Sequence, residues 1–322
     1  MDETTNSALV HIPVLYKEVP EIVVHRPDGL YVDGTFGRGG HSRLILERLS
    51  PEGRLIAFDR DPQAVAEAAK IQDPRFTIIH APFSSMAEEL AARGITEVDG
   101  VFLDIGVSSP QIDDPTRGFS FRFDGPLDMR MDTSCGVTAA EWLAESKEEE
   151  IAEVIKNYGE ERFAKKIARA IVTKRETEPL LTTRALADLV KSVVPVNKKD
   201  NMQHPATRTF QAIRIAVNGE LDQLKNALAA AGSILNDGGL LAVISFHSLE
   251  DRIVKQFFEK MSNPASGIDP RLPLLPDQLP QPLFDRGRRV LPSDEEKEAN
   301  PRARSSVLRY AERTDAPWRD AQ

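Results

Sequence analysis

Apolar residues in the first third of the chain gather in four short, almost continuous runs, at residues 30–32, 54–58, 76–80 and 98–105. Between these runs, apolar residues recur at helical spacing, as they do in the segment 42–49. Apolar strands that alternate with helices are typical of a parallel sheet covered on both faces. Two more apolar runs, at 240–245 and 306–310, extend the pattern near the end of the chain. The pattern predicts an α/β fold with a mostly parallel sheet.

This alternation stops at about residue 113. Residues 113–132 are rich in glycine, proline, aspartate and arginine, which favours a long loop. Helical patterns without intervening strands follow, including those at 161–174 and 183–193. We therefore predict an inserted all-helical domain at 113–205, between two parts of the α/β domain at 1–112 and 206–322.

Local signals also predict where individual helices begin and end. Pro205 is expected to open a long helix that runs to about Leu235 and ends at Gly238 and Gly239. The residues expected to mark the starts of other helices are the pairs Thr138 and Glu141, Ser146 and Glu149, and Ser248 and Asp251. Residues 264–292 hold seven prolines and are expected to form an irregular loop, and the last ten residues are expected to fray.

Composition narrows the class of protein. The chain has 322 residues, of which 41% are hydrophobic and 28% are charged, as in ordinary globular proteins. No apolar run approaches the roughly 20 residues of a membrane span, and the polar N-terminus resembles neither a signal peptide nor a transit peptide. Cys135 is the single cysteine, which excludes an internal disulfide and a multi-cysteine metal site. We expect a cytoplasmic protein.

The distribution of charge is more informative than its sum. A net charge of −9 argues against general binding of polyanions. Between Arg162 and Arg214, however, twelve lysines and arginines face only four acidic residues. This basic segment is either a solvated helix face or the electrostatic footprint of a nucleic acid on an otherwise acidic protein.

A glycine-rich stretch, from residue 30 to residue 41, follows the first predicted strand. Asp33 ends the strand, and the four glycines that come next are Gly34, Gly37, Gly39 and Gly40. Glycines at this place let a ligand approach the main chain beside the N-terminus of the following helix. The pattern favours a site for a nucleotide-like ligand over a glycine turn that binds nothing.

Asp59 lies at the end of the second predicted strand, 20 positions after Gly39. In doubly wound sheets, an acidic residue at this place accepts hydrogen bonds from ribose hydroxyl groups. The alternative is that Asp59 caps the helix that follows. Its distance from the glycine loop favours the ribose role.

The glycine spacing limits the choice of ligand. A dinucleotide fingerprint requires G-x-G-x-x-G, and here the third glycine is out of register, while no Walker sequence is present. The stretch from Asp33 to Gly40 instead resembles the D-x-T-x-G-x-G-G loop of S-adenosylmethionine-dependent methyltransferases. The amino-acid part of that ligand suits backbone amides and Asp33, directly or through water.

Three longer stretches identify a family. They are DIGVSSPQ at 104–111, HPATRTFQAIRIAVN at 204–218 and SFHSLEDR at 245–252, to which HIPVL at 11–15 and NPRARS at 300–305 add support. With these motifs the chain resembles the bacterial 16S ribosomal RNA cytosine-N4 methyltransferase family, also called MraW or RsmH. The resemblance covers nearly the whole chain, and the long central motif is far more specific than the glycine loop.

The resemblance implies a class I S-adenosylmethionine methyltransferase fold, Rossmann-like, with a helical insertion. It implies an enzyme that methylates a cytidine of 16S ribosomal RNA at the decoding centre of the small subunit. In the cofactor site that it implies, Asp59 would hold the ribose and Phe83 would pack on the adenine. The residues implied to bind the cofactor are Gly39, Gly40, His41, Asp59, Phe83, Asp104 and Gln111.

Several of these residues have ordinary structural alternatives. Phe83 could belong to the core, His41 could simply sit in the first turn of a helix, and His247 could be a structural histidine ahead of a cap at Ser248. Arg208 and Arg214 could pair with neighbouring carboxylates instead of RNA.

The residue that accepts the N4 proton is left open. Amino-methyltransferases often carry Asp/Asn-Pro-Pro-aromatic after the fourth strand, and this chain departs from that motif. We hypothesise that Asp104, or a carbonyl or hydroxyl group in the turn 108–110, accepts the N4 hydrogen bonds. The cytosine is expected to flip into the cleft. The basic segment is expected to grip phosphates, and methyl transfer itself needs no metal.

Three other functions compete with this one. A non-catalytic ribosome-assembly factor would share the basic segment but would not need the cofactor loop. The glycine spacing of this chain is not that of an NAD-dependent oxidoreductase, and the chain lacks the motif that is usual in DNA amino-methyltransferases. The sequence leaves the oligomeric state open, with a homodimer as one option.

Overall fold

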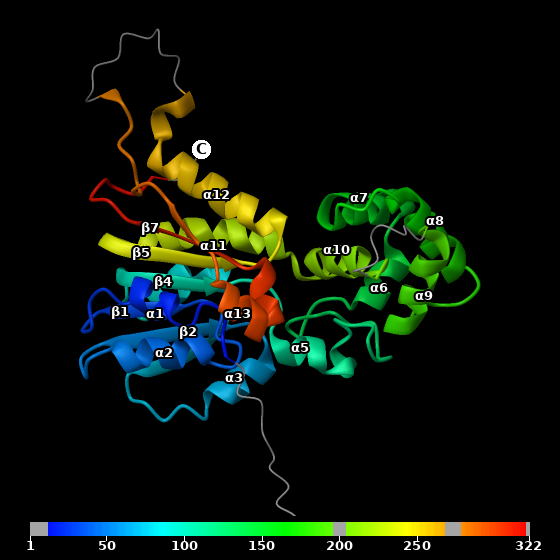
Figure 1. Cartoon of the computed structure of the whole chain (residues 1–322), viewed down its shortest axis with the longest axis horizontal. Helices are drawn as coiled ribbons and strands as arrows, with labels where there is room; N and C mark the ends of the chain where they lie inside the picture. Colours follow the sequence, from blue (N-terminus) through cyan, green and yellow to red (C-terminus); the bar gives the residue numbers. More distant parts are fainter. Residues whose placement is uncertain (1–11, 196–203, 268–277, 320–322) are drawn as a thin grey trace, which may run out of the picture. The chain divides into compact units, whose positions relative to one another are not determined.

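The computed structural model describes residues 12–195, 204–267 and 278–319, so His11 of the early motif lies outside the described residues. The chain forms two compact units; in the colours of Figure 1, unit 2 is green, and unit 1 consists of a blue-to-cyan part and a yellow-to-red part. Unit 1 contains the chain up to Gly106 and again from Gln223 onwards, and unit 2 is the segment Val107–Asp222. The segment 113–205, which the sequence marks as an insertion, falls inside unit 2.

Unit 1 is built on a seven-stranded sheet of order β3-β2-β1-β4-β5-β7-β6. The first five strands are parallel, whereas β7 runs antiparallel to both β5 and β6. The strands are β1 (Leu30–Asp33), β2 (Arg54–Asp59), β3 (Phe76–His80), β4 (Val98–Asp104), β5 (Leu235–Ser245), β6 (Arg288–Val290) and β7 (Val307–Glu312). The predicted α/β fold with a mostly parallel sheet is therefore confirmed.

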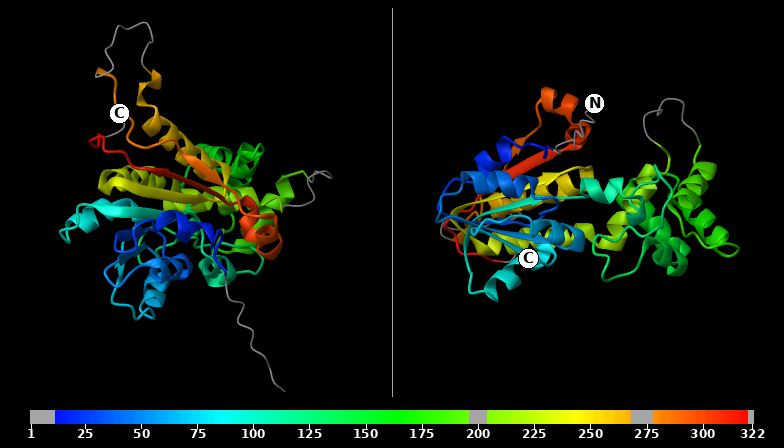
Figure 2. Two further views of the ribbon diagram at one scale, coloured as in Figure 1. Left: turned by 60° about the vertical axis from the view of Figure 1, so that its left-hand side comes forward. Right: turned by 90° about the horizontal axis from the view of Figure 1, so that it is seen from below.

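Helices cover both faces of this sheet, as the views in Figure 2 also show. Alternate residues of each strand enter different cores: Val32, Val101 and Val243 pack with one set of helices, whereas Tyr31 and Phe102 pack with another. This alternation explains why the strands read as continuous apolar runs. The helices of unit 1 are α1 (Glu18–Val23), α2 (Gly40–Arg48), α3 (Pro62–Ala68), α4 (Met86–Ala91), α11 (Glu220–Ile234, which begins in unit 2), α12 (Ser248–Ser262) and α13 (Asp294–Ala299), with 3-10 turns η1 (Phe83–Ser85), η3 (Pro264–Gly267) and η5 (Pro301–Ser305).

Unit 2 is helical and has its own core. Its elements are α5 (Ser109–Asp113), η2 (Pro115–Arg117), α6 (Ala139–Glu145), α7 (Glu148–Gly159), α8 (Ala164–Arg175), α9 (Thr183–Val193) and α10 (Thr207–Asn218). Phe210, Ala212 and Ile213 of α10 lie in the same core as Ile151 and Ile155 of α7. Packing of α10 on α7 explains why this unit continues past residue 205.

The single long helix expected from Pro205 to Leu235 is wrong. Gly219 adopts a left-handed conformation with φ of 59°, and it separates α10 from α11. Beside this break, Arg214 pairs with the buried Glu220 at 2.8 Å. The carboxylate alternative for Arg214 is therefore the one that the structure supports.

Gly238 and Gly239 do not end a helix. They lie inside β5, where the register against β4 shifts between the pairs formed by Val98 and Gly100. Glycine in a strand often marks such an irregularity. The strand therefore begins earlier than the apolar run 240–245 predicts.

Two of the three predicted helix starts are shifted by one residue. The capping box of Thr138 and Glu141 is confirmed at α6. At α7 the N-cap is Lys147, with no side-chain cap, so the box expected at Ser146 is wrong. At α12 the N-cap is His247 instead of Ser248, because its ring accepts a hydrogen bond from the amide of Glu250.

The C-terminal region has more structure than the sequence predicts. Strand β6 and helix α13 were not expected, and the chain from Arg313 to Arg319 is not frayed where it is described. Arg313 is buried and donates to the carbonyls of Leu283 and Ala316, while Trp318 packs against the core. Within the described ranges, no helix is long and apolar enough to cross a membrane.

Candidate functional site

Acidic residues mark the carboxyl ends of three neighbouring strands in unit 1. Asp33 ends β1, Asp59 ends β2 and Asp104 ends β4. The chain passes from β1 to β2 on one side and places β4 on the other side, so the strand order reverses beside β1. Ligands of open α/β sheets bind at such a reversal. The sheet therefore brings these predicted residues to one edge.

The glycine loop lies directly above this edge. Gly39 has φ of 73°, and a Cβ atom there would lie 2.6 Å from the ring of Phe36, so only glycine fits without a shift. Helix α2 begins at Gly40, and the amide of Arg43 donates the first bond of the helix to the carbonyl of Gly39. The amides of Gly40 and His41 precede that bond, as anion-binding amides at helix starts do.

Asp33 is fully buried and holds the loop in shape. Its Oδ2 accepts from the hydroxyl of Ser42 at 2.6 Å, and its Oδ1 accepts from the amide of Thr35 at 3.0 Å. Burial raises the pKa of this carboxyl to about 6. Direct contact of Asp33 with a ligand is therefore not supported, because the side chain has no exposed surface.

Asp59 ties the end of β2 to the glycine loop. Its Oδ2 accepts from the amide of Gly37 at 2.7 Å, and its Oδ1 accepts from the amide of Asp61 at 2.8 Å. The N-cap of α3 is Asp61, which accepts from the amide of Gln63 at 2.9 Å. The cap alternative for Asp59 is therefore wrong. Burial raises the pKa of Asp59 to about 6, and each oxygen keeps a second lone pair for a ligand hydroxyl.

His41 and Asp104 face each other. The Nε2 atom of His41 lies 3.6 Å from Oδ2 of Asp104, and the imidazole packs edge-on against Phe102. Neither ring nitrogen of His41 nor Oδ1 of Asp104 has a hydrogen-bond partner among the described residues. His41 does lie in the first turn of α2, but its ring points to the strand ends, so the two interpretations of His41 coexist.

The charge states of this pair are set by burial. Burial lowers the pKa of His41 to about 3, so its imidazole is neutral near pH 7. Burial, and then the negative charges of Asp33 and Glu250, raise the pKa of Asp104 to about 8, although 27% of the side chain stays exposed. Near pH 7 the neutral forms of both His41 and Asp104 are therefore favoured.

Glu250, beyond the end of β5, was missed by the sequence analysis. It is 1% exposed, and its Oε2 accepts from the amides of Phe246 and His247, at 2.9 and 3.3 Å. Its Oε1 lies 3.0 Å from Nε2 of His247. The spacing of His247 and Glu250 is that of a capping box, but histidine is an unusual cap, so the sequence signal was assigned to Ser248 instead.

Phe83 is half-buried in η1, directly after β3. It packs against the core, and its Cβ lies 3.1 Å from the place where a Cβ on Gly34 would stand. Part of the Phe83 side chain thus does belong to the core, as the alternative interpretation expected. Because the ring is not fully buried, it can also present a surface to a ligand.

Gln111 belongs to unit 2, whereas the other six predicted residues belong to unit 1. It is 6% exposed, and its side chain accepts from the amide of Ser108 at 2.9 Å to close a capping box at α5. The structure thus gives Gln111 a role in shaping the turn that follows β4. The sequence analysis missed this box.

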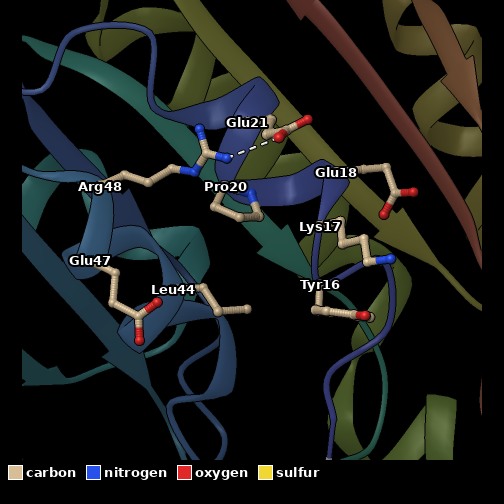
Figure 3. A pocket seen from close by; sticks show the side chains of 8 residues that line it. All are labelled: Tyr16, Lys17, Glu18, Pro20, Glu21, Leu44, Glu47 and Arg48. Carbon is tan, nitrogen blue, oxygen red and sulfur yellow. Dashed lines mark hydrogen bonds and ion pairs between the residues drawn. The ribbon is translucent and has the colours of Figure 1, made fainter.

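Two hollows in the surface of unit 1 lie away from these strand ends. One, of about 430 Å³, is lined by side chains of α1, α2 and the turn before α1 (Figure 3), and Arg48 pairs with Glu21 across it at 3.0 Å. The other, of about 810 Å³, adjoins α12. None of the predicted cofactor residues lines either of them.

The sheet order, the antiparallel β7, the glycine loop after β1 and the carboxylate after β2 define the class of this protein. They are the features of an α/β methyltransferase that uses S-adenosylmethionine. Comparison with known proteins then gives the family: the MraW methylase family matches residues 8–314. The chain belongs to the MraW methylase family, and it is a methyltransferase.

Named relatives agree over almost the full length. The chain is 56% identical to the ribosomal RNA small subunit methyltransferase H of Chromobacterium violaceum, over 97% of both chains. It is 57% identical to the protein of the same name from Burkholderia vietnamiensis, over 95% of this chain and 98% of the relative. A solved structure of a putative rRNA methylase from Clostridium thermocellum aligns with 94% of each chain at 13% identity and a TM-score of 0.41.

Proposed function

We propose that this protein transfers a methyl group from S-adenosylmethionine to N4 of a cytidine in 16S ribosomal RNA, at the decoding centre of the small subunit, in the cytoplasm. Membership of the family supports a ribosomal RNA substrate, since the relatives are named for methylation of small-subunit RNA. The observation that carries the proposal is the set of carboxylates at the ends of β1, β2 and β4, beside the loop of Gly39.

The residues at this edge fit a cationic ligand. The carboxyls of Asp33 and Asp59, with pKa values of about 6, are mostly ionised near pH 7, whereas His41 is neutral and does not offset them. S-adenosylmethionine carries a sulfonium and an ammonium group, whereas the pyrophosphate of NAD would meet the same carboxylates unfavourably. This charge balance supports a methyl donor over a dinucleotide.

Each predicted residue has a task in the proposed site. The amides of Gly40 and His41 would take the carboxylate of the methionine part, and Asp59 would accept from the ribose hydroxyls. Phe83 would pack on the adenine, where stacking on an aromatic ring is worth ~1–3 kcal/mol per base. Asp104 would face the positive end, and Gln111 would complete the pocket.

Methyl transfer requires the chain to position N4 of the cytosine and to accept a proton from it. S-adenosylmethionine, when bound, supplies a methyl group that is already activated by the sulfonium. N4 of cytosine is a weak nucleophile because its lone pair is delocalised into the ring, and its protons become acidic as the new bond forms. The chain must hold N4 roughly 3–3.5 Å from the carbon of the transferred methyl group. Asp104 is proposed to accept the N4 proton.

The proposal is tested by the product. Purified protein, S-adenosylmethionine with a labelled methyl group and small subunits that lack the modification are incubated, and the RNA is digested for mass spectrometry. The expected product is N4-methylcytidine at one position of 16S RNA. Label in another base, in the 2′-hydroxyl or only in DNA would contradict the proposal.

The pKa of Asp104, about 8, predicts a pH dependence of donor binding. Below pH 8 the carboxyl is mostly neutral, and a cationic donor favours the ionised form. The affinity should therefore rise between pH 6 and pH 8, with release of a proton on binding, and level off above that. Calorimetry in buffers of different ionisation enthalpy measures the released protons. The variant Asp104→Asn serves as control and should release fewer; equal release would refute the assignment.

The basic segment of unit 2 is proposed to contact phosphates, but only part of it is available. Arg175 donates to the carbonyls of Leu143 and Ser146, and Arg169 pairs with Glu148. The two exposed lysines on α8, Lys165 and Lys166, make no ion pair among the described residues. These two are the residues of the segment that we assign to RNA.

Charge reversal tests that assignment. The variant Lys165→Glu/Lys166→Glu should bind the RNA substrate several-fold more weakly, with a shallower salt dependence, because two phosphate contacts are lost. The matched control is Lys147→Glu/Lys156→Glu, on α7 and its cap. RNA binding is measured by filter retention between 50 and 200 mM salt. Equal loss in both variants would show that only the overall charge matters.

A further inference from the structure

A second basic surface lies in unit 1, in the hollow of about 810 Å³ beside α12. Its walls come from the C-terminal half of α12, from the residues around β6 and from β7. The charged side chains that line it are Lys255, Glu259, Lys260, Arg286, Arg288 and Arg309. Five of these six are cations, although the whole chain has a net charge of −9.

The dipole of helix α12 explains only part of this positive charge. Lys260 lies in the last turn of α12, where cations ordinarily complement the helix dipole, whereas Lys255 lies in the middle of the helix. Arg286, Arg288 and Arg309 come from other segments and have no such reason to converge there. Their convergence indicates a surface built for an anion.

Neighbouring carboxylates fix the positions of two of these arginines, Arg309 and Arg288. Arg309 donates to both carboxylate oxygens of Asp251, at 2.7 and 3.1 Å. Arg288 pairs with Asp285 at 3.1 Å and lies over the ring of Tyr310. Each guanidinium has five N–H donors, so donors remain for a ligand. Held side chains also lose less entropy on binding.

The cations exceed the carboxylates around the hollow. Glu259, Asp251 and Asp285 offset three of the five positive charges. Arg286 makes no ion pair among the described residues. Positive charge that these three carboxylates do not offset therefore lies at Arg286.

The hollow lies along the helix that begins beside the candidate site, α12. Asp251, which holds Arg309, lies in the first turn of α12, whose N-cap His247 borders the buried Glu250. Arg309 also faces Val243, two positions before the end of β5. With a rise of 1.5 Å per residue, Lys255 and Lys260 follow the start of α12 by about 10 and 18 Å. Nucleotides that flank a base at the strand ends can reach this distance.

We propose that this hollow binds backbone phosphates of the RNA substrate, beside the nucleotide that is methylated. The inference rests on the proposed function for its substrate. It adds a second contact with RNA, on unit 1, to the one assigned to Lys165 and Lys166.

The test compares two double charge reversals of equal size. Lys260→Glu/Arg286→Glu changes the hollow, and the control Lys70→Glu/Arg93→Glu changes exposed cations just after α3 and α4, elsewhere on unit 1. The probe is a fluorescent single strand of 16S RNA that contains the target cytidine, and anisotropy is read between 50 and 200 mM salt. This measurement needs no methyl transfer.

The hollow variant should bind the probe at least 10-fold more weakly at 100 mM salt than the control variant. The slope of log affinity against log salt should also fall by about 1.4, since each contact with single-stranded RNA contributes about 0.7. Calorimetry with S-adenosylmethionine should show unchanged donor binding. If the glutamates unfold the protein, Lys260→Gln/Arg286→Gln should give the same change of slope with a smaller loss.

Three results would overturn the inference. The hollow variant and its control could lose the same affinity, or the variant could bind RNA as the wild type does. Methylation of small subunits could fall while binding of the RNA probe is unchanged, which would place a ribosomal protein in the hollow instead. A wild-type protein that binds the probe but methylates nothing would refute the proposed function and leave this inference standing.

Discussion

Replacing Asp59 by alanine is expected to weaken the binding of S-adenosylmethionine at least 100-fold. The variant loses the proposed acceptor of the ribose hydroxyls, and it also releases the amides of Gly37 and Asp61 that the carboxylate holds. Both effects act on the same ligand, because Gly37 belongs to the loop that would receive the methionine part. Calorimetry of the purified variant measures the loss.

Asp61 provides the matched control, since it lies two residues away and caps α3. Asp61→Ala should lower the free energy of unfolding by about 0.5–2 kcal/mol through the lost cap, with donor binding within a few-fold of wild type. If both variants lost binding equally, the effect of Asp59 would be one of local folding, and the ribose role would have to be abandoned.

Asp104→Asn is expected to lower the single-turnover rate of methyl transfer by about 100- to 10,000-fold at saturating donor, the usual contribution of a positioned proton acceptor. Asparagine is close in size to aspartate, so donor and RNA should still bind. The rate is measured by rapid quench, with the enzyme in excess of the small subunits.

Asp99 gives a control on the same strand. It lies at the opposite end of β4, where it accepts from the amide of Leu30 and from Arg26. Asp99→Asn should leave the single-turnover rate unchanged. A normal rate for Asp104→Asn would remove Asp104 from the chemistry and leave the carbonyls and hydroxyls of the turn 108–110 as the acceptors to test.

Local sequence was enough to predict six of the seven strands of the sheet, all but β6, and the glycine loop. The apolar runs are buried on both faces, so each strand is visible as an unbroken hydrophobic segment. The left-handed Gly39 is also a local feature, because the ring of Phe36 occupies the place of a side chain. Helix α9 was predicted with its bounds, and in the structure the side chain of Thr182 caps its start.

Other features depended on contacts that sequence spacing does not contain. Gly219 breaks the helix expected from Pro205, yet glycines inside helices are tolerated elsewhere, so its left-handed conformation could not be read from the chain. The cap at His247 depends on the orientation of its ring towards the amide of Glu250. Neither the helix break at Gly219 nor the cap at His247 follows from composition or periodicity.

The sequence predicted which residues form the site better than it predicted their charges and pKa values. Asp59 was singled out because it ends an apolar strand after the glycine loop, and Asp104 because of the resemblance to the family. Asp33 was expected near the ligand, but the hydroxyl of Ser42 and the amide of Thr35 take up its oxygens. The charge contributed by Glu250 comes from more than a hundred residues further along the chain, so only the folded sheet brings it beside Asp104.

The place of unit 2 in the chain has a consequence for synthesis. Strand β5 pairs with β4, but the whole of Val107–Asp222 is made between them. At about 5–20 residues per second, the ribosome needs on the order of ten seconds to cross that segment. During this time Val98–Asp104 forms the open edge of a half-made sheet with apolar side chains on both faces, an arrangement that invites pairing with other chains. The edge of β4 therefore stays uncovered by its native neighbour until β5 emerges.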